Sequence, residues 1–212
     1  MLVAKELLGK FFVTGTSTSV GKTYATAALL KESQKFDRKV LGLKPLASGA
    51  VNGINDDALA LMESSNVSLS LSDINPYCFE MPVAPHIAAK RANVQLTADN
   101  IVAGLKNMLE LDTDLCLIEG AGGWAVPINE QQMWADVVRL MDIPVLLIVG
   151  MTLGCINHAL LTERAIIADN CVLHGWIANP LDPDMLAYEE NLETLKAQMK
   201  SPFLGELSIN QA

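Results

Sequence analysis

The chain has 212 residues, of which 50% are hydrophobic and 18% charged, so its composition excludes a disordered or low-complexity protein. Lys and Arg number 15 against 24 Asp and Glu, and the resulting net charge of −9 argues against a nucleic-acid partner. No apolar run reaches the ~18 residues of a membrane span, no signal-peptide core follows Met1, and the four cysteines form no CxxC pair. We therefore expect a single cytoplasmic domain over residues 1–212, with no membrane partner and no zinc site.

Apolar runs of strand length alternate with segments of helical period, which predicts an α/β fold with a doubly wound, mainly parallel sheet. In chain order, the expected strands cover residues 11–14, 40–44, 115–119, 145–149, 175–178 and 203–207. The expected helices cover residues 23–30, 58–62, 97–111, 134–141, 157–168 and 185–199. The uninterrupted Val/Leu/Ile run at 145–149 is predicted as the central strand. Residues 66–91 contain three prolines and are expected to form an irregular excursion over the carboxyl ends of the strands.

A glycine-rich loop stands between the first expected strand and the first expected helix. Its sequence, GTSTSVGKT over residues 15–23, is Walker A-like with one residue more than the usual GxxxxGK[ST] spacing. The glycines let backbone N–H groups approach phosphate oxygens, Lys22 adds positive charge, and the Thr23 hydroxyl suits Mg²⁺. The loop therefore predicts a nucleotide phosphate site, and the alternative is a Gly/Ser turn with a solvated lysine.

Charged residues end two other expected strands. Glu119 precedes the glycine-rich sequence GAGG, and Lys44 lies on the same rim as the hydroxyl of Ser48. Ligands gather at the carboxyl ends of parallel strands, so Glu119 and Asp57 are candidate Mg²⁺ ligands with Thr23, and Lys44 is a candidate for the transferring phosphoryl group. Each has a structural alternative: a strand-end cap for Glu119, a solvated lysine for Lys44, and a helix-dipole partner for Asp57.

Several sequence blocks resemble those of the dethiobiotin synthetases, ATP-dependent ring-closing enzymes of biotin synthesis. The blocks are FVTGTSTSVGKT, KPLASG, DDALAL, NPYCFEMPVAPHIAA, EGAGGW, GCINHALLT and GWIAN, and the resemblance runs from about residue 12 to residue 206. It implies a P-loop NTPase type of fold, a homodimer, ATP as co-substrate and Mg²⁺. The implied reaction converts 7,8-diaminononanoate and CO2 to dethiobiotin through a carbamate and a carbamic-phosphoric anhydride, with release of ADP and phosphate.

The same resemblance implies roles for individual residues. The catalytic set would be Lys44, Lys22, Thr16 and Ser48, and the metal set Thr23, Asp57 and Glu119. ATP would be bound by Gly15, Ser19, Val20, Gly21, Lys22, Thr23, Tyr24, Glu119, Gly122, Asn179, Leu204, Gly205 and Glu206. The diamine would meet Ser48, Gly122 and, from the neighbouring subunit, Leu153, Gly154, Cys155, Ile156 and Asn157. The chain departs from the family at Ser17 and Ser19, where relatives commonly or often carry an acid.

Two other functions are kept open by the sequence. One is a P-loop ATPase switch of the partitioning or septum-positioning type, although such loops normally carry an additional early lysine where this chain has Thr and Ser. The other is a nucleotide-binding relative with weak catalysis. Four residues keep two interpretations each. His86 and His158 are structural or substrate-positioning rather than acid/base groups, Trp124 walls the substrate or packs, and Cys155 is either reactive or a buried, inert thiol.

Overall fold

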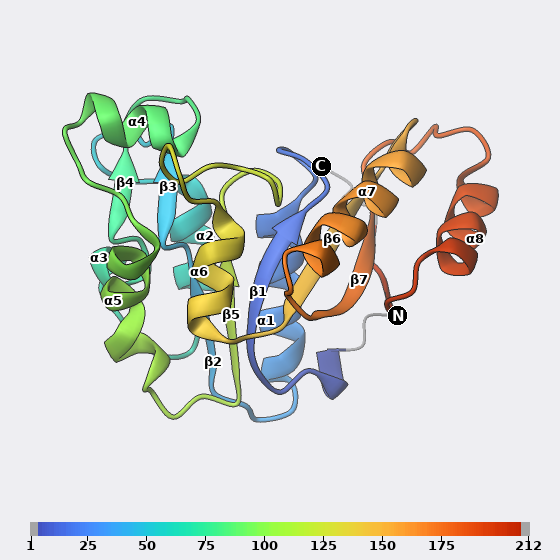
Figure 1. The fold of residues 1–212 in the computed structure, drawn as a ribbon. Coiled ribbons are helices and arrows are strands. Elements are labelled where there is room, and N and C mark those ends of the chain that lie inside the picture. The colour runs from blue at the N-terminus through green and yellow to red at the C-terminus, as the bar shows by residue number, and fades with distance from the viewer. Residues whose placement is uncertain (1–3, 209–212) are drawn as a thin grey trace.

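A computed structural model describes residues 4–208 of the chain. Within that range, six strands form a parallel sheet in the order β2-β5-β1-β6-β7-β8 (Figure 1). Their bounds are β1 Gly9–Gly15, β2 Val40–Leu43, β5 Leu115–Glu119, β6 Val145–Met151, β7 Leu173–Pro180 and β8 Phe203–Glu206. The predicted doubly wound parallel sheet is confirmed, and the apolar run predicted as central is β6, between β1 and β7.

Helices cover both faces of this sheet. One face carries α1 (Lys22–Gln34) and α2 (Asp56–Glu63), and the other carries α5 (Ala98–Leu109), α6 (Trp134–Met141), α7 (Cys155–Ala168) and α8 (Tyr188–Gln198) (Figure 1). A short 3-10 helix, η1, spans Ala4–Glu6. Strand side chains alternate between the faces, so the sheet is apolar on both sides and separates one cluster of buried side chains on the α1 face from two on the other. None of the helices within residues 4–208 is long and apolar enough to cross a membrane.

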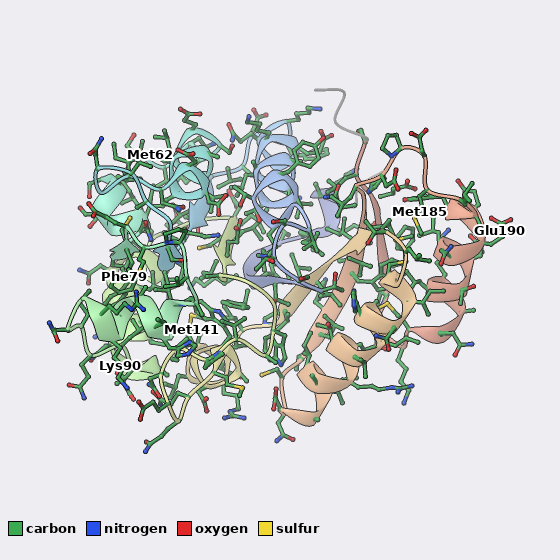
Figure 2. The ribbon with its side chains drawn as sticks, turned by 90° about the horizontal axis from the view of Figure 1, so that it is seen from above. Met62, Phe79, Lys90, Met141, Met185 and Glu190 are labelled. Carbon is green, nitrogen blue, oxygen red and sulfur yellow. The ribbon has the colours of Figure 1, made fainter. Side chains whose placement is uncertain are left out.

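The expectation that residues 66–91 are irregular is wrong. This segment contains α3 (Leu71–Ile74), β4 (Tyr77–Phe79) and α4 (Pro85–Arg91), and β4 pairs in parallel with β3 (Leu46–Ser48). The prolines border these elements, and Pro85 occupies the first turn of α4, where a missing N–H costs little. Viewed from above, Phe79 and Lys90 lie at one end of the molecule, and Met185 and Glu190 lie at the other (Figure 2).

Three helix starts differ from the prediction by two or three residues, and α2 begins at Asp56 rather than at residue 58. The helix expected from residue 157 begins at Cys155, because Gly154 takes a left-handed conformation (φ +95°) immediately before it. The helix expected from residue 185 begins at Tyr188, after Ala187, which also has a positive φ of 56°. The interpretation of residues 1–212 as one domain stays a prediction.

Candidate functional site

The alternation of side chains carries Glu119 and Lys44 to the same face of the sheet. Along β5, Leu115 and Leu117 pack toward α1, so Glu119, two residues further on, also points to that face. Along β2, Val40 packs toward α1, and the same period of two brings Lys44 to this face just after the strand ends. The two charges thus meet at the carboxyl end of the sheet, next to the start of α1.

The two charges form a compact buried cluster with residues from both helices of that face. The Lys44 Nζ atom lies 2.6 Å from Glu119 Oε1 and 2.9 Å from Asp57 Oδ2. The Thr23 hydroxyl donates to Glu119 Oε1 at 2.7 Å. Lys44 and Glu119 are 3% and 0% exposed, whereas Asp57 is half-buried. These contacts bring Thr23, Asp57, Glu119 and Lys44 together, and the roles predicted for them stay predictions.

The charges in the cluster change the proton affinities of its members. Burial acts to lower the pKa of Lys44, but the carboxylates of Glu119 and Asp57 outweigh it and raise that pKa above its ordinary value. Burial likewise acts to raise the pKa of Asp57, but the Lys44 charge outweighs it and the pKa falls. Lys44 is therefore a cation and Asp57 an anion over the whole physiological range of pH.

The backbone of Lys44 is held by the segment that precedes β4. The Lys44 N–H donates to the Ile74 carbonyl at 2.9 Å, and the Asn75 side-chain amide donates to the Lys44 carbonyl at 2.6 Å. Asn75 is 5% exposed. Because both backbone groups of Lys44 are satisfied, its side chain leaves the sheet in a fixed direction.

A cavity of about 380 Å³ opens over this cluster. Its lining contains most of the residues predicted for phosphate, metal and catalysis, namely Ser19, Gly21, Lys22, Thr23, Lys44, Ser48, Asp57, Glu119 and Gly122. It also contains four residues that sequence reasoning missed, Thr18, Ala47, Asn55 and Ala121. Of these, Asn55 had a readable signal, because an Asn directly before a helix is a typical N-cap, and its side chain accepts the Ala58 N–H.

The phosphate loop leaves its backbone donors free at one wall of the cavity. Gly21 is the N-cap of α1 in a left-handed conformation (φ 78°), and no side chain caps the helix. The first N–H groups of α1 are therefore available to an anion, whose charge the helix dipole also favours. The Lys22 ammonium donates to the Ser17 carbonyl at 3.2 Å. Burial, and then the nearby charge of Lys44, lowers the pKa of Lys22 to about 8.

Other predicted site residues lie outside the lining of this cavity. The Thr16 hydroxyl accepts the Gly150 N–H at 3.4 Å, and the Tyr24 hydroxyl donates to the Ser208 carbonyl at 3.2 Å. Asn179, at the end of β7, is buried behind the phosphate loop. Residues 204–206 belong to the edge strand β8, where the Glu206 carboxylate accepts the Tyr188 hydroxyl at 2.6 Å. The catalytic role of Thr16 and the contacts of the other residues with ATP stay predictions.

The segment predicted to serve a neighbouring subunit begins at the exposed end of the loop after β6. Leu153 is 98% exposed, whereas Cys155 is fully buried at the start of α7. Burial raises the pKa of the Cys155 thiol, so the interpretation as an inert thiol is favoured over the reactive one. No side chain caps α7. The Cys155 N–H donates to the Thr152 carbonyl at 2.9 Å, whereas the Ile156 and Asn157 N–H groups have no backbone acceptor among residues 4–208, which suits the predicted carboxylate.

Trp124, His158 and His86 lie in three different environments. Trp124 is 3% exposed, its indole donates to Asp169 at 2.7 Å, and its ring packs edge-on against Phe12, so it packs rather than lining the cavity. His158 is exposed in the first turn of α7. His86 lines a second, larger cavity of about 1080 Å³ beside α4, which contains none of the predicted site residues.

The cluster around Glu119 fits a hard divalent cation. Within residues 4–208, no group of three His, Cys, Asp or Glu side chains is arranged for a metal. The ligands that the protein itself offers here are the carboxylates of Asp57 and Glu119 and the hydroxyl of Thr23. The Glu119 Oε2 atom is buried and has no hydrogen-bond partner in the described part of the chain. An unpaired buried carboxylate oxygen suits Mg²⁺, which takes few protein ligands and completes its shell with phosphate oxygens and water.

The fold and this loop define a P-loop type of α/β nucleotide-binding protein. A family model described as an AAA domain matches residues 9–212. A chain of the MinC:MinD cell division protein complex from Aquifex aeolicus superimposes with a TM-score of 0.55 at 19% identity, covering 96% of this chain and 82% of that one. This likeness shows the shared fold alone.

Curated relatives narrow the class to one enzyme family. The chain is 45% identical to the ATP-dependent dethiobiotin synthetase BioD of Pseudoalteromonas translucida, over 92% of this chain and 88% of the relative. It is 43% identical to the protein of the same name from Pseudomonas aeruginosa, over 93% of this chain and 88% of the relative. The chain belongs to the dethiobiotin synthetase family, and the resemblance read from its sequence is confirmed.

Proposed function

We propose that this chain closes the cyclic urea of dethiobiotin from 7,8-diaminononanoate, CO2 and ATP. One amine adds to CO2 and loses a proton, giving a carbamate. A carbamate oxygen then attacks the γ-phosphorus of ATP, and the bond to ADP breaks. The second amine attacks the carbonyl carbon of the mixed anhydride, and phosphate and a proton leave. The observation that carries this proposal is the buried lysine–carboxylate cluster beside the phosphate loop, in a chain over 40% identical to named dethiobiotin synthetases.

The proposed roles of the cavity residues follow from their charges. Lys22 and the free amides of the loop bind the triphosphate, while Lys44 and Ser48 face the carbamate and the γ-phosphate, with Thr16 beside them. Because the reacting groups are supplied by the substrates, the protein needs no covalent nucleophile. Its contribution is to hold two anions, the carbamate and the γ-phosphate, close together and to offset their charge.

Mg²⁺ would be held by the hydroxyl of Thr23 and the carboxylates of Asp57 and Glu119. When bound, it supplies positive charge to the β- and γ-phosphate oxygens. Ser17 and Ser19 contribute no charge to its outer shell, in contrast to the acids of many relatives.

A second subunit completes the site in this proposal. The exposed residue Leu153 and the uncapped start of α7 lie in the segment that would receive the substrate carboxylate of the neighbouring protomer. The adenine would contact Asn179 and the β8 backbone around Gly205. The cytoplasm, where biosynthetic substrates and ATP are available, is the proposed location.

The test measures phosphate release and dethiobiotin, the latter by mass spectrometry, with each substrate omitted in turn. We expect both products only when diaminononanoate, bicarbonate, ATP and Mg²⁺ are present together. Lys44→Ala should slow the single-turnover chemical step far more than it weakens ATP binding, whereas Lys90→Ala, at an exposed lysine, should change neither. ATP hydrolysis that is equally fast without the diamine, with no cyclic urea formed, would refute the proposal and favour the switch function.

A further inference from the structure

Asn179 is tied to the back of the phosphate loop. Its side chain is 3% exposed, and its Nδ2 atom donates to the Val20 carbonyl at 2.8 Å. The same nitrogen lies only 2.1 Å from the position that a Cβ atom at residue Gly21 would take. Loop and side chain are therefore in direct contact, and only glycine fits between them.

The hydrogen bond from Asn179 fixes the orientation of one peptide plane in the loop. The Val20 carbonyl and the Gly21 N–H belong to the same trans peptide, so they point in opposite directions. With the carbonyl held behind the loop by Asn179, the Gly21 N–H is turned to the front, where Gly21 lines the cavity. This N–H donates to no acceptor among residues 4–208.

We infer that Asn179 is a positioning residue for phosphate binding, which acts through the Val20 carbonyl to aim the Gly21 N–H at a phosphate oxygen. The inference rests on the proposed function, because it needs the triphosphate to lie in this cavity. It is separate from recognition of the base. The Nδ2 atom serves the loop, which leaves the side-chain oxygen of Asn179 as the acceptor for an adenine amino group.

Loss of this side chain affects the loop in two ways. The buried Val20 carbonyl loses its partner, and the peptide plane is free to turn toward another donor. A phosphate chain then has to reorder the peptide before it gains the Gly21 hydrogen bond. A bond of this kind corresponds to about a 5- to 10-fold change in affinity.

The decisive ligand is one that has phosphates and no base. We expect Asn179→Ala to bind Mg-tripolyphosphate about 5- to 10-fold more weakly than wild type in isothermal titration calorimetry. The matched control is Asn66→Ala. Asn66 donates to the Arg38 carbonyl at the same 2.8 Å distance and its side-chain oxygen accepts the Val40 N–H, at the amino end of β2, away from the cavity. This variant should bind tripolyphosphate as wild type does.

The outcomes separate the inference from the proposed function. If Asn179→Ala and wild type bind tripolyphosphate with equal affinity, the inference is overturned and the role of Asn179 is limited to binding the base. The proposed function is then unaffected, because wild type still forms dethiobiotin. A wild-type protein that binds no tripolyphosphate refutes the phosphate site on which both depend.

A measurement on wild type covers the case in which Asn179→Ala does not fold. The side-chain amide resonance of Asn179 in ¹H–¹⁵N spectra should shift when Mg-tripolyphosphate is added, while that of Asn66 should stay fixed. An Asn179 resonance that stays fixed while the loop amides shift would also overturn the inference.

Discussion

Replacing Lys44 by methionine should destabilise the fold far beyond what the loss of a surface ion pair costs. Met fills much of the same volume but leaves the Glu119 carboxylate, which is 0% exposed, with the Thr23 hydroxyl as its remaining donor. Removing one partner of a buried pair costs about 3–5 kcal/mol, because the other charge stays buried without compensation. Asp57 is 47% exposed and adds little, since water replaces its lost partner. We therefore expect Lys44→Met to lower the free energy of unfolding by about 3 kcal/mol at pH 7.

Urea unfolding of four proteins tests this value: wild type, Lys44→Met, Glu119→Gln and the double variant. The double variant removes both buried charges, so it should be less destabilised than the sum of the single variants by about 2 kcal/mol. Lys90→Met is the control, because its pair with Glu130 is exposed on both sides and its loss should leave unfolding unchanged. A cost for Lys44→Met as small as that for Lys90→Met, or strict additivity in the cycle, refutes the reasoning.

The pH dependence of the same difference has a definite sign. The folded-state pKa of Asp57 is lowered, so the stability from its pairing with Lys44 is present above its unfolded value and is lost as pH falls through the folded one. The folded-state pKa of Lys44 is raised, so its contribution is complete below the unfolded value and is lost as pH rises through the folded one. The part of the gap between wild type and Lys44→Met that comes from Asp57, which is small at pH 7, should thus be flat from about pH 5 to pH 9 and shrink toward lower pH.

Four further outcomes follow from the structure. Lys22→Ala should lose most ATP turnover at little cost in urea stability, because this buried cation contacts a carbonyl and no carboxylate. In wild type, ATP binding measured by calorimetry should weaken as pH rises through about 8, where Lys22 loses its proton. The thiols of Cys116 and Cys155 should resist Ellman's reagent until urea is added, since burial raises the pKa of both, that of Cys116 to about 12; modification of either in the folded protein contradicts this. Analytical ultracentrifugation should find a dimer, and a fully active monomer at micromolar concentration would rule out a shared site.

The unit made of β1, the phosphate loop and α1 could be predicted because its signals are local. A β-branched and aromatic run, a glycine loop and an Ala/Leu-rich segment lie next to one another in the chain. Glu119 and Lys44 were also predictable, because each is the charge that ends an apolar run and strand ends meet at one edge. The contact between them was not, since it joins residues 75 apart in sequence.

The small sheet of β3 and β4 was missed for a different reason. Each strand has three residues, which is too short for an alternation of apolar and polar residues to appear. Pro76 and Pro82 flank β4, and prolines at this spacing are typical of a loop. Yet this segment supplies Ile74 and Asn75, which form hydrogen bonds with the backbone of Lys44. The position of Lys44 therefore depends on residues that are not themselves predicted site residues.

The family resemblance implies an acid at position 17, where this chain has a serine. The Lys22 ammonium contacts the backbone carbonyl of Ser17, so this bond does not depend on the side chain at that position. The four buried or half-buried charges at the site, on Lys22, Lys44, Asp57 and Glu119, sum to zero. An Asp at position 17 would make that sum negative and oppose a phosphate chain, whereas Ser17 leaves it neutral. In the proposed site, the serine therefore favours the anion while it gives less to the outer shell of the cation. If Mg²⁺ is held as proposed, this chain should depend on Asp57 and Glu119 for it more than an enzyme with the acid does.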